Sequence, residues 1–443
     1  MFALTALLYL DESECKWKLA VHALNVLRLI LSDGTLGPDL NAYIPDTAQL
    51  AVRGFTAPQW AVRNSCMMVF TAVAQRAVGT DKNDSSGAAV PTITEFFQRF
   101  PVLEPFLVSE LTVATAPVDG SVHPTLYPLM LLIAKLRVAV MEDSNVPSTD
   151  SFVGTATSCA TIAQLIQLVG RCSGQKVQAV RVIAAKALRV LTPVSGSPAA
   201  AAELIISARA LLENAHKQRL DLNALHGRVL AARELLRSTC TYTEANAHTN
   251  EDFVAVLRQQ TVEQVVPVLA ALVESAAELQ CAAVHIALLD AVRAVQLIVK
   301  GAAQTAVDDA DGLLIQVCRQ TLPAIYFAGL GSPAVRILPF EPWLWRECMH
   351  SMVHLSLSRT VSPALQAHCL PAEMVAELLN HRISEVREGT LRGLLDHLRD
   401  QQRGQQQSLS DGLMQQLLQR VGAEREPPVS QLAMQVFTWY ALH

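Results

Sequence analysis

Residues 61–70, 179–188 and 385–394 read AVRNSCMMVF, AVRVIAAKAL and EVREGTLRGL. In each segment a valine precedes an arginine, a small residue follows that arginine after three positions, and a large apolar residue follows it after seven. This spacing is typical of the inner helix of a HEAT or armadillo repeat, where the small residue lets a neighbouring helix approach. A weaker copy begins at Ala291-Val-Arg293. The segments therefore predict an all-α fold of helical repeats, a HEAT/armadillo-like α-solenoid.

Helical spacing of apolar residues extends over most of the remaining chain. Ala20, Leu24, Leu27 and Leu31 are separated by four, three and four positions, which places them on one helix face. The Val-Arg segments are two to three repeat lengths apart, at roughly 40 to 47 residues per repeat, so the intervening repeats must be degenerate. Helices are expected at 162–169, 177–191, 199–214, 222–236, 262–277, 282–299 and 374–379.

Polar, turn-rich segments interrupt the predicted helices. We expect exposed loops near residues 80–91 and 142–155, and a low-complexity connector over residues 401–410, where glutamines cluster. Residues 1–400 are predicted to form one continuous solenoid with no separable domain, and residues 411–443 to add a terminal helix pair to the same solenoid.

Composition excludes several classes of protein. A chain of 443 residues with 51% hydrophobic and 17% charged residues can bury a large core and is not disordered. Its formal net charge of -5 gives no overall attraction for nucleic acid, so an RNA contact needs a local basic surface or a basic partner. Nine cysteines without a Cys-x-x-Cys pair indicate reduced thiols, and no segment is typical of a signal peptide or a membrane span. We expect a cytoplasmic protein with no membrane partner.

Arg63 and Asn64, one turn into a helix expected to start near Pro58, are candidate contacts for a protein partner or for RNA phosphate. In a structural alternative, Arg63 hydrogen-bonds the loop or an acidic group of the adjacent repeat while Trp60 packs between helices. The same arginine recurs in the other two Val-Arg segments. This recurrence favours the structural alternative, because a binding residue has no reason to repeat.

The most basic stretch of the chain lies between residues 151 and 202, which contain no acidic residue. On a helix, Lys186 and Arg189 share a face and Arg181 lies about 80° from Arg189, which suits a positive ridge. The alternative is a solvated helix surface with no ligand, because the charges lack interleaved aromatic residues. The candidate RNA contacts are Arg171, Lys176, Arg181, Lys186 and Arg189.

Signatures of catalysis are missing from the sequence. Binding a methyl donor needs a glycine-rich turn between a strand and a helix. The candidate turn, at Gly329 and Gly331, is followed at once by Pro333 and has no strand-helix alternation around it. Gly-x-Ser-x-Gly, P-loop and His-Glu-x-x-His motifs are also absent. We therefore assign no catalytic residue, metal ligand or cofactor, and predict that the chain is not an enzyme on its own.

Several short motifs follow one another in a specific order: His22-Ala-Leu-Asn25, Gly54-Phe-Thr56, Trp60-Ala-Val-Arg-Asn-Ser65 and Phe96-Phe-Gln-Arg-Phe-Pro101. In this order they resemble the thyroid adenoma-associated protein family, and further segments extend the resemblance over about residues 21–236. Residues 378–387 resemble a late repeat of the family, whereas residues 241–301 contain no landmark of it. The resemblance implies a helical-repeat scaffold.

The resemblance also implies a partner and a process. Members of this family act with an FtsJ-like methyltransferase that modifies the ribose 2′-O of the first anticodon-loop nucleotide in certain tRNAs. This chain would then be a non-catalytic regulatory subunit in tRNA processing, with tRNA reached through the complex. Family members are several times longer, and their Arg-Arg-Ser-Ala-Gly-Leu-Pro motif lies upstream of the block that begins at His22 and is not in this chain. The chain would then be a C-terminal portion, an incomplete gene model or a short divergent form.

A second function remains open from the sequence. A helical-repeat protein of this kind also suits a protein-binding adaptor, either transport-receptor-like or an assembly scaffold, without a tRNA role. Such an adaptor would hold a protein segment in its groove. The two functions predict different partners, a methyltransferase with tRNA in one case and a peptide segment in the other.

Overall fold

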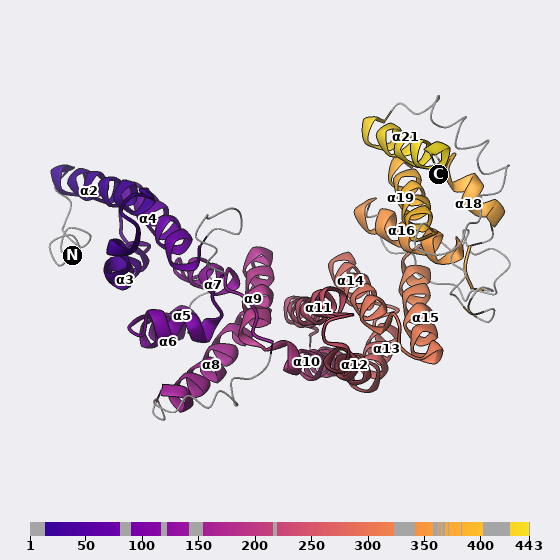
Figure 1. Cartoon of the computed structure of the whole chain (residues 1–443), viewed down its shortest axis with the longest axis horizontal. Coiled ribbons are helices and arrows are strands. Elements are labelled where there is room, and N and C mark those ends of the chain that lie inside the picture. The colour runs from indigo at the N-terminus through magenta and orange to yellow at the C-terminus, as the bar shows by residue number, and fades with distance from the viewer. Residues whose placement is uncertain are drawn as a thin grey trace. The chain divides into compact units, whose positions relative to one another are not determined.

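The computed structural model describes residues 14–79, 90–116, 122–140, 154–215, 219–322, 342–357, 362, 365, 368–370, 372–381, 383–401 and 426–442 (Figure 1). The named elements in these residues are all helices. The one β-type contact in the described part of the chain is an isolated bridge between Thr92 and Arg137. The predicted all-α fold is confirmed.

Two compact units divide the chain. The first comprises the described residues of 1–200 together with 230–238, and the second those of 201–229 and 239–443. Helix α11 (Leu222–Ala245) contributes to both. Each unit is described by itself below, and the prediction of one continuous solenoid over residues 1–400 stays a prediction.

The first unit is a succession of short helices that pack on near neighbours in the sequence, as helical repeats do. Its elements are α2 (Glu14–Ser32), η1 (Gly37–Tyr43), α3 (Ile44–Gly54), α4 (Trp60–Val78), α5 (Ile93–Arg99), α6 (Leu103–Ala114), α7 (Leu126–Ala134), α8 (Gly154–Arg171), η2 (Cys172–Gly174), α9 (Gln178–Leu191) and η3 (Val194–Gly196). Helices α2 and α3 both pack on α4, α6 packs on α8, and α7 and α8 both pack on α9. Contacts of this local kind confirm the predicted helical-repeat class.

The second unit continues the same pattern. Its elements are α10 (Ser197–Glu213), α12 (Glu251–Gln260), a π-helical turn (Thr261–Val265), α13 (Val266–Ser275), α14 (Ala282–Val299), α15 (Gln304–Thr321), α16 (Pro342–Leu357), α18 (Ala372–Leu378), α19 (Ser384–Gln401) and α21 (Pro427–Leu442). Helices α14, α15 and α16 pack in sequence order, and α19 packs on both α16 and α21. By length and apolar composition α14 could cross a membrane, but 61% of it is buried in this packing, as in the core helix of a soluble protein.

The three Val-Arg segments occupy equivalent positions at the start of α4, α9 and α19. In each, the valine, the small residue and the large apolar residue are buried, and the arginine is the fourth residue of its helix. Its guanidinium turns back onto the loop before the helix: Arg63 donates to the carbonyls of Ala57 and Pro58 at 2.8 Å, Arg181 to those of Gln175 and Lys176 at 2.6 and 3.0 Å, and Arg387 to that of His381 at 2.8 Å. The arginine therefore closes the turn between consecutive helices, which confirms that its recurrence is structural.

One part of that structural alternative is wrong. Trp60 is the first residue of α4 and is 69% exposed, so it does not pack between helices. The start of the helix at Trp60 agrees with the prediction that it begins near Pro58. The weaker copy at Arg293 lies in the middle of α14, and this arginine bonds to α16 instead of closing a loop.

Glycines bring α16 and α19 close together. A methyl group added at Gly393 would lie 2.7 Å from the carbonyl oxygen of His350 and 2.8 Å from the Cβ atom of Val353. One added at Gly389 would overlap the carbonyl oxygen of Arg346. The absence of side chains at these two positions therefore sets the distance between the two helices.

Several predicted segments lie outside the described residues. They are residues 80–89 of the first predicted loop, 142–153 of the second, 402–410 of the connector and 411–425 of the terminal helix pair, together with the turn at Gly329 and Gly331. Helix α21 lies within the predicted terminal pair.

Candidate nucleic-acid interface

Helix α9 positions the predicted basic residues. Most of its apolar residues are buried against α7 and α8, which leaves a narrow exposed strip along the helix. Gln178, Val182, Lys186 and Arg189 follow one another on that strip at spacings of four, four and three residues. Lys186 is exposed and has no ion-pair partner within the part of the chain that the structure describes. Its ammonium group is therefore available to a ligand.

Two arginines of α11 join Arg189 around one buried carboxylate. Glu234 is 1% exposed, and Arg233 Nη2, Arg237 Nη1 and Arg189 Nη1 lie 2.7, 3.5 and 3.8 Å from its oxygens. A buried carboxylate is tolerated only when it is paired, so Glu234 fixes the guanidinium groups around it. Arg237 is nevertheless 58% exposed in its side chain. We call Lys186, Arg189, Arg233 and Arg237 the basic surface, and the three arginines of this surface contact Glu234.

A shallow hollow of about 390 Å³ lies beside Lys186, between α7 and α9. Its apolar floor comes from α9, and Tyr127 of α7, 41% exposed, forms one side. The remaining polar groups of its lining are Gln178 and Lys186. An aromatic ring and a cation thus border one concave surface.

The other predicted RNA contacts divide into exposed and engaged residues. Arg171, the last residue of α8, and Lys176, in the loop before α9, are both exposed. Arg181 is 7% exposed, and its guanidinium bonds the loop carbonyls. The predicted ridge is therefore corrected: Lys186 and Arg189 share the exposed strip, and Arg181 turns away from it.

The two predicted contacts on α4 also differ from each other. Arg63 donates both of its described hydrogen bonds to the preceding loop. Asn64 is exposed and lies on the same strip of α4 as the exposed side chains of Trp60 and Met67, at spacings of four and three residues. Asn64 is therefore better placed than Arg63 to contact a partner, on a strip that is apolar and polar but not charged.

Sequence reasoning missed Arg233, Glu234, Arg237 and Tyr127. Two arginines four positions apart share a helix face, but this pattern is ordinary on a solvated helix and gave no signal by itself. Their approach to Arg189 depends on tertiary structure. The aromatic residue that the basic stretch lacks in sequence is supplied by α7, more than fifty residues before Lys186.

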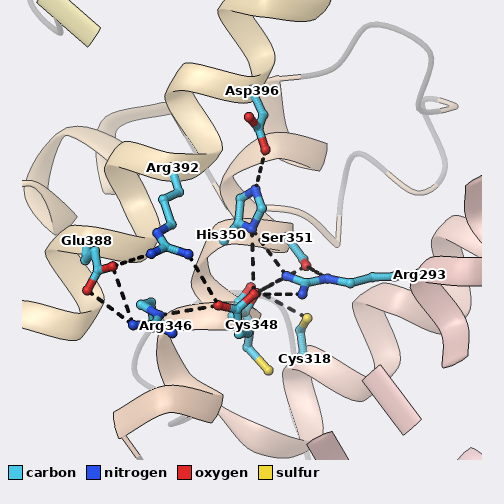
Figure 2. A network of polar contacts seen from close by, with 10 residues as sticks. Arg293, Cys318, Arg346, Cys348, His350, Ser351, Glu388, Arg392 and Asp396 are labelled. Carbon is cyan, nitrogen blue, oxygen red and sulfur yellow. Dashed lines mark hydrogen bonds and ion pairs between the residues drawn. The ribbon is translucent and has the colours of Figure 1, made fainter. Parts of the chain in front are cut away.

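A second arginine network lies in the other unit, among α14, α16 and α19 (Figure 2). Arg293 donates to Glu347 Oε2 at 2.8 Å, to the Glu347 carbonyl at 2.7 Å and to Ser351 Oγ at 2.9 Å. His350 Nε2 lies 2.8 Å from Asp396 Oδ2. The network is completed by Arg346 and Arg392, whose guanidinium groups lie 3.5 and 2.7 Å from Glu388.

The charges in this network stabilise one another. Burial alone would raise the pKa of Glu347, but its interactions with His350 and Arg293 outweigh burial and hold that pKa well below 4.5. Burial opposes protonation of His350, yet the hydrogen bond to Asp396 and the interaction with Glu347 raise its pKa above 6.5. The hydrogen bond from His350 lowers the pKa of Asp396. Three arginines and one histidine therefore meet three carboxylates, and the network holds three helices together.

The fold and the site define a helical-repeat protein with a local basic surface. Comparison with protein families gives two adjacent matches: residues 8–61 match the description "THADA/TRM732, DUF2428" and residues 63–235 match "Trm732, C-terminal TPR repeats". The chain belongs to the THADA/Trm732 family, which confirms the resemblance. That description names TPR repeats, so the helical-repeat class is confirmed while the HEAT/armadillo type stays a prediction.

Similar curated proteins are regulators by name. The human "tRNA (32-2'-O)-methyltransferase regulator THADA" is 31% identical over 249 residues, which cover 55% of this chain and 12% of the relative. The corresponding regulator trm732 of Schizosaccharomyces pombe is 26% identical over 244 residues, 54% of this chain and 15% of the relative. The match thus spans about an eighth of the human protein. Among solved structures, an engineered protein covers 99% of this chain with 14% identity and a TM-score of 0.28, too low to support an argument.

Proposed function

We propose that this chain is a non-catalytic scaffold and regulatory subunit in tRNA 2′-O-methylation. Its partner is an FtsJ-like methyltransferase that modifies a ribose in the tRNA anticodon loop, in the cytoplasm. Support comes from the family, since its human and fission yeast members are named as regulators of a tRNA (32-2'-O)-methyltransferase and not as methyltransferases. The methyltransferase supplies the chemistry, and this chain supplies binding surfaces.

The observation that carries the tRNA contact is the basic surface. The whole chain has a net charge of -5, yet this surface carries Lys186 together with three arginines that contact Glu234. Guanidinium groups present paired donors that match phosphate oxygens, and Glu234 holds them in place before a ligand arrives. Arg171 and Lys176, exposed on the same unit, remain candidate contacts farther along the RNA backbone.

The methyltransferase contact is assigned to the exposed strip of α4. Trp60, Asn64 and Met67 lie there without a free charge, because the guanidinium of Arg63 is engaged in the loop. Exposed tryptophan and methionine side chains are typical of protein interfaces, and uncharged surfaces do not attract phosphate. Protein and RNA thus contact different helices of the first unit.

The test of the tRNA contact uses the 443-residue chain co-expressed with the methyltransferase. The double variant K186E/R237E should weaken tRNA binding by the complex and lower the slope of log affinity against log salt by about 0.9 for each phosphate that the variant no longer neutralises. Arg189 is left unchanged because its side chain is only 31% exposed, against 58% for Arg237, so a glutamate at position 189 has less room to turn away from the buried Glu234. The matched control is R53E/K300E, which makes the same charge change at two exposed positions elsewhere.

Equal tRNA affinity and salt dependence in the two double variants would contradict the tRNA contact.

For the protein contact, Trp60→Ala should reduce co-purification of the methyltransferase while leaving the helix content unchanged. The adaptor alternative predicts a different outcome. A protein segment should then be bound to this chain, and anticodon-loop ribose methylation in cells should not depend on the chain.

A further inference from the structure

We propose that the hollow between α7 and α9 binds one unpaired nucleotide of an RNA, with the base against Tyr127 and the phosphate at Lys186. This proposal rests on the proposed tRNA role and adds a specific contact to it. It concerns a base that is flipped out of its helix or lies in a loop, because a paired base offers no face for stacking.

The backbone at Tyr127, which lines one side of the hollow, is held by the turn that begins α7. His123 Nδ1 lies 2.8 Å from Thr125 Oγ1, and the backbone N–H of Thr125 also donates to His123 Nδ1 at 3.4 Å. Leu126 and Pro128, on either side of Tyr127, are buried. Because the backbone is anchored on both sides, Tyr127 stays at the hollow, and a tyrosine side chain has few torsions to order on stacking, which lowers the entropic cost.

The floor of the hollow suits a planar aromatic group. It is formed by Ala179, Val182 and Ile183, which come from successive turns of α9 and carry no polar side-chain atom. The hollow, at about 390 Å³, is at the lower end of the range for small-ligand sites, on the order of 300 to 1,000 Å³. An apolar floor and an aromatic wall favour a nucleobase over a sugar or a charged side chain.

The polar groups at the rim match the rest of a nucleotide. The Gln178 amide can both donate to and accept from a base edge. The Lys186 ammonium lies at the boundary between the hollow and the basic surface, where Arg189 follows one helical turn later. Because the lining contains no carboxylate, nothing in it repels a phosphate. The next phosphates of the strand would then lie toward the arginines around Glu234.

Stacking and charge can be separated experimentally. In the complex of the full chain with the methyltransferase, Tyr127→Ala should weaken binding of tRNA and of a short single-stranded ribo-oligonucleotide by about tenfold. Tyr127→Phe should bind as the wild type does, because its ring still stacks. Neither variant should change the salt slope, since no charge is removed. Tyr127 is partly exposed, so both variants should keep the wild-type thermal unfolding midpoint.

A second measurement locates the nucleotide. RNA carrying 4-thiouridine at single anticodon-loop positions should crosslink, at one position, to peptides of α7 or α9 in the wild type. The yield of this crosslink should be lower in Tyr127→Ala.

If K186E/R237E weakens binding while Tyr127→Ala does not, the proposal that the hollow binds a base is wrong and the tRNA role stands. If neither changes binding and no crosslink falls on α7 or α9, the tRNA contact itself fails.

Discussion

The basic surface of the first unit and the arginine network of the second contain the same kinds of side chain in different proportions. In the network three arginines and His350 meet three carboxylates, and each cation has a carboxylate partner on a neighbouring helix. In the basic surface, three arginines contact Glu234, and Lys186 lies on α9 without an ion-pair partner among the described residues. Charges that are paired across helices stabilise packing, whereas an unpaired cation at the surface can still bind an anion.

Helix packing accounts for the difference. Glycines 389 and 393 let the backbones of α16 and α19 approach closely, and the side chains of Glu347 and Glu388 are only 12 and 15% exposed there. By contrast, α9 and α11 meet at Glu234 through long arginine side chains, which extend past the carboxylate toward solvent. Charge pairing and helix spacing together distinguish the arginine network from the proposed binding surface.

The largest effect expected is the loss of stability in Glu347→Ala. This variant leaves Arg293 and Arg346 close together without the carboxylate between them, and removing one partner of a largely buried pair costs on the order of 3 kcal/mol. Denaturant unfolding measures the change. Glu203→Ala, at an exposed position of α10, is the control and should be neutral. A loss in Glu347→Ala no greater than in this control would mean that the network is not structural.

A somewhat smaller effect is expected when a methyl group is placed between α16 and α19. Gly393→Ala brings a Cβ atom against the carbonyl oxygen of His350, which is backbone and cannot move away without shifting the helix, and should destabilise by roughly 1 to 3 kcal/mol. The matched control is Gly170→Ala in α8, where nothing lies within 4 Å and the added methyl group should stabilise by about 0.5 kcal/mol. The two thermal midpoints should therefore move in opposite directions, and equal shifts would contradict the close approach.

The network should also make stability depend on pH. The pKa of His350 is raised above 6.5 in the folded protein by Asp396 and Glu347, so its stabilising contribution is complete below about pH 6.5 and is lost as the pH rises through the raised pKa. Unfolding free energy should fall over that range in the wild type and less in His350→Gln. Arg293 also faces His350, and His354 and Arg399 face Asp396, so the comparison of the two proteins, rather than either profile alone, isolates His350. Equal slopes would contradict the assignment.

Much of the fold could be predicted from sequence because it depends on local spacing. The valine, the arginine, the small residue and the large apolar residue recur at fixed spacings, and they occupy equivalent positions in α4, α9 and α19. Lys186 and Arg189 could be found because they share one helix face. Arg233, Glu234 and Tyr127 could not, because they reach α9 only through tertiary packing. The exposure of Trp60 was missed for a related reason: sequence does not show which face of a helix has a neighbour.

The smallest effect on stability is expected for Arg237→Ala. This variant tests whether the arginines around Glu234, unlike those of the network, bind RNA. In Arg237→Ala, Glu234 keeps Arg233 at 2.7 Å and Arg189 at 3.8 Å, so the buried carboxylate stays paired. The side chain removed is largely exposed, and changes at such positions usually alter the free energy of unfolding by no more than about 0.5 kcal/mol.

RNA affinity of the complex should nevertheless fall in Arg237→Ala. It should fall by a similar factor for different RNA sequences, because a phosphate contact carries no base information. Unfolding and RNA binding measured on the same preparation check both statements. If Arg237→Ala destabilises the protein as strongly as Glu347→Ala and leaves RNA affinity unchanged, then the arginines around Glu234 are structural too, and the contrast in charge pairing does not identify a binding surface.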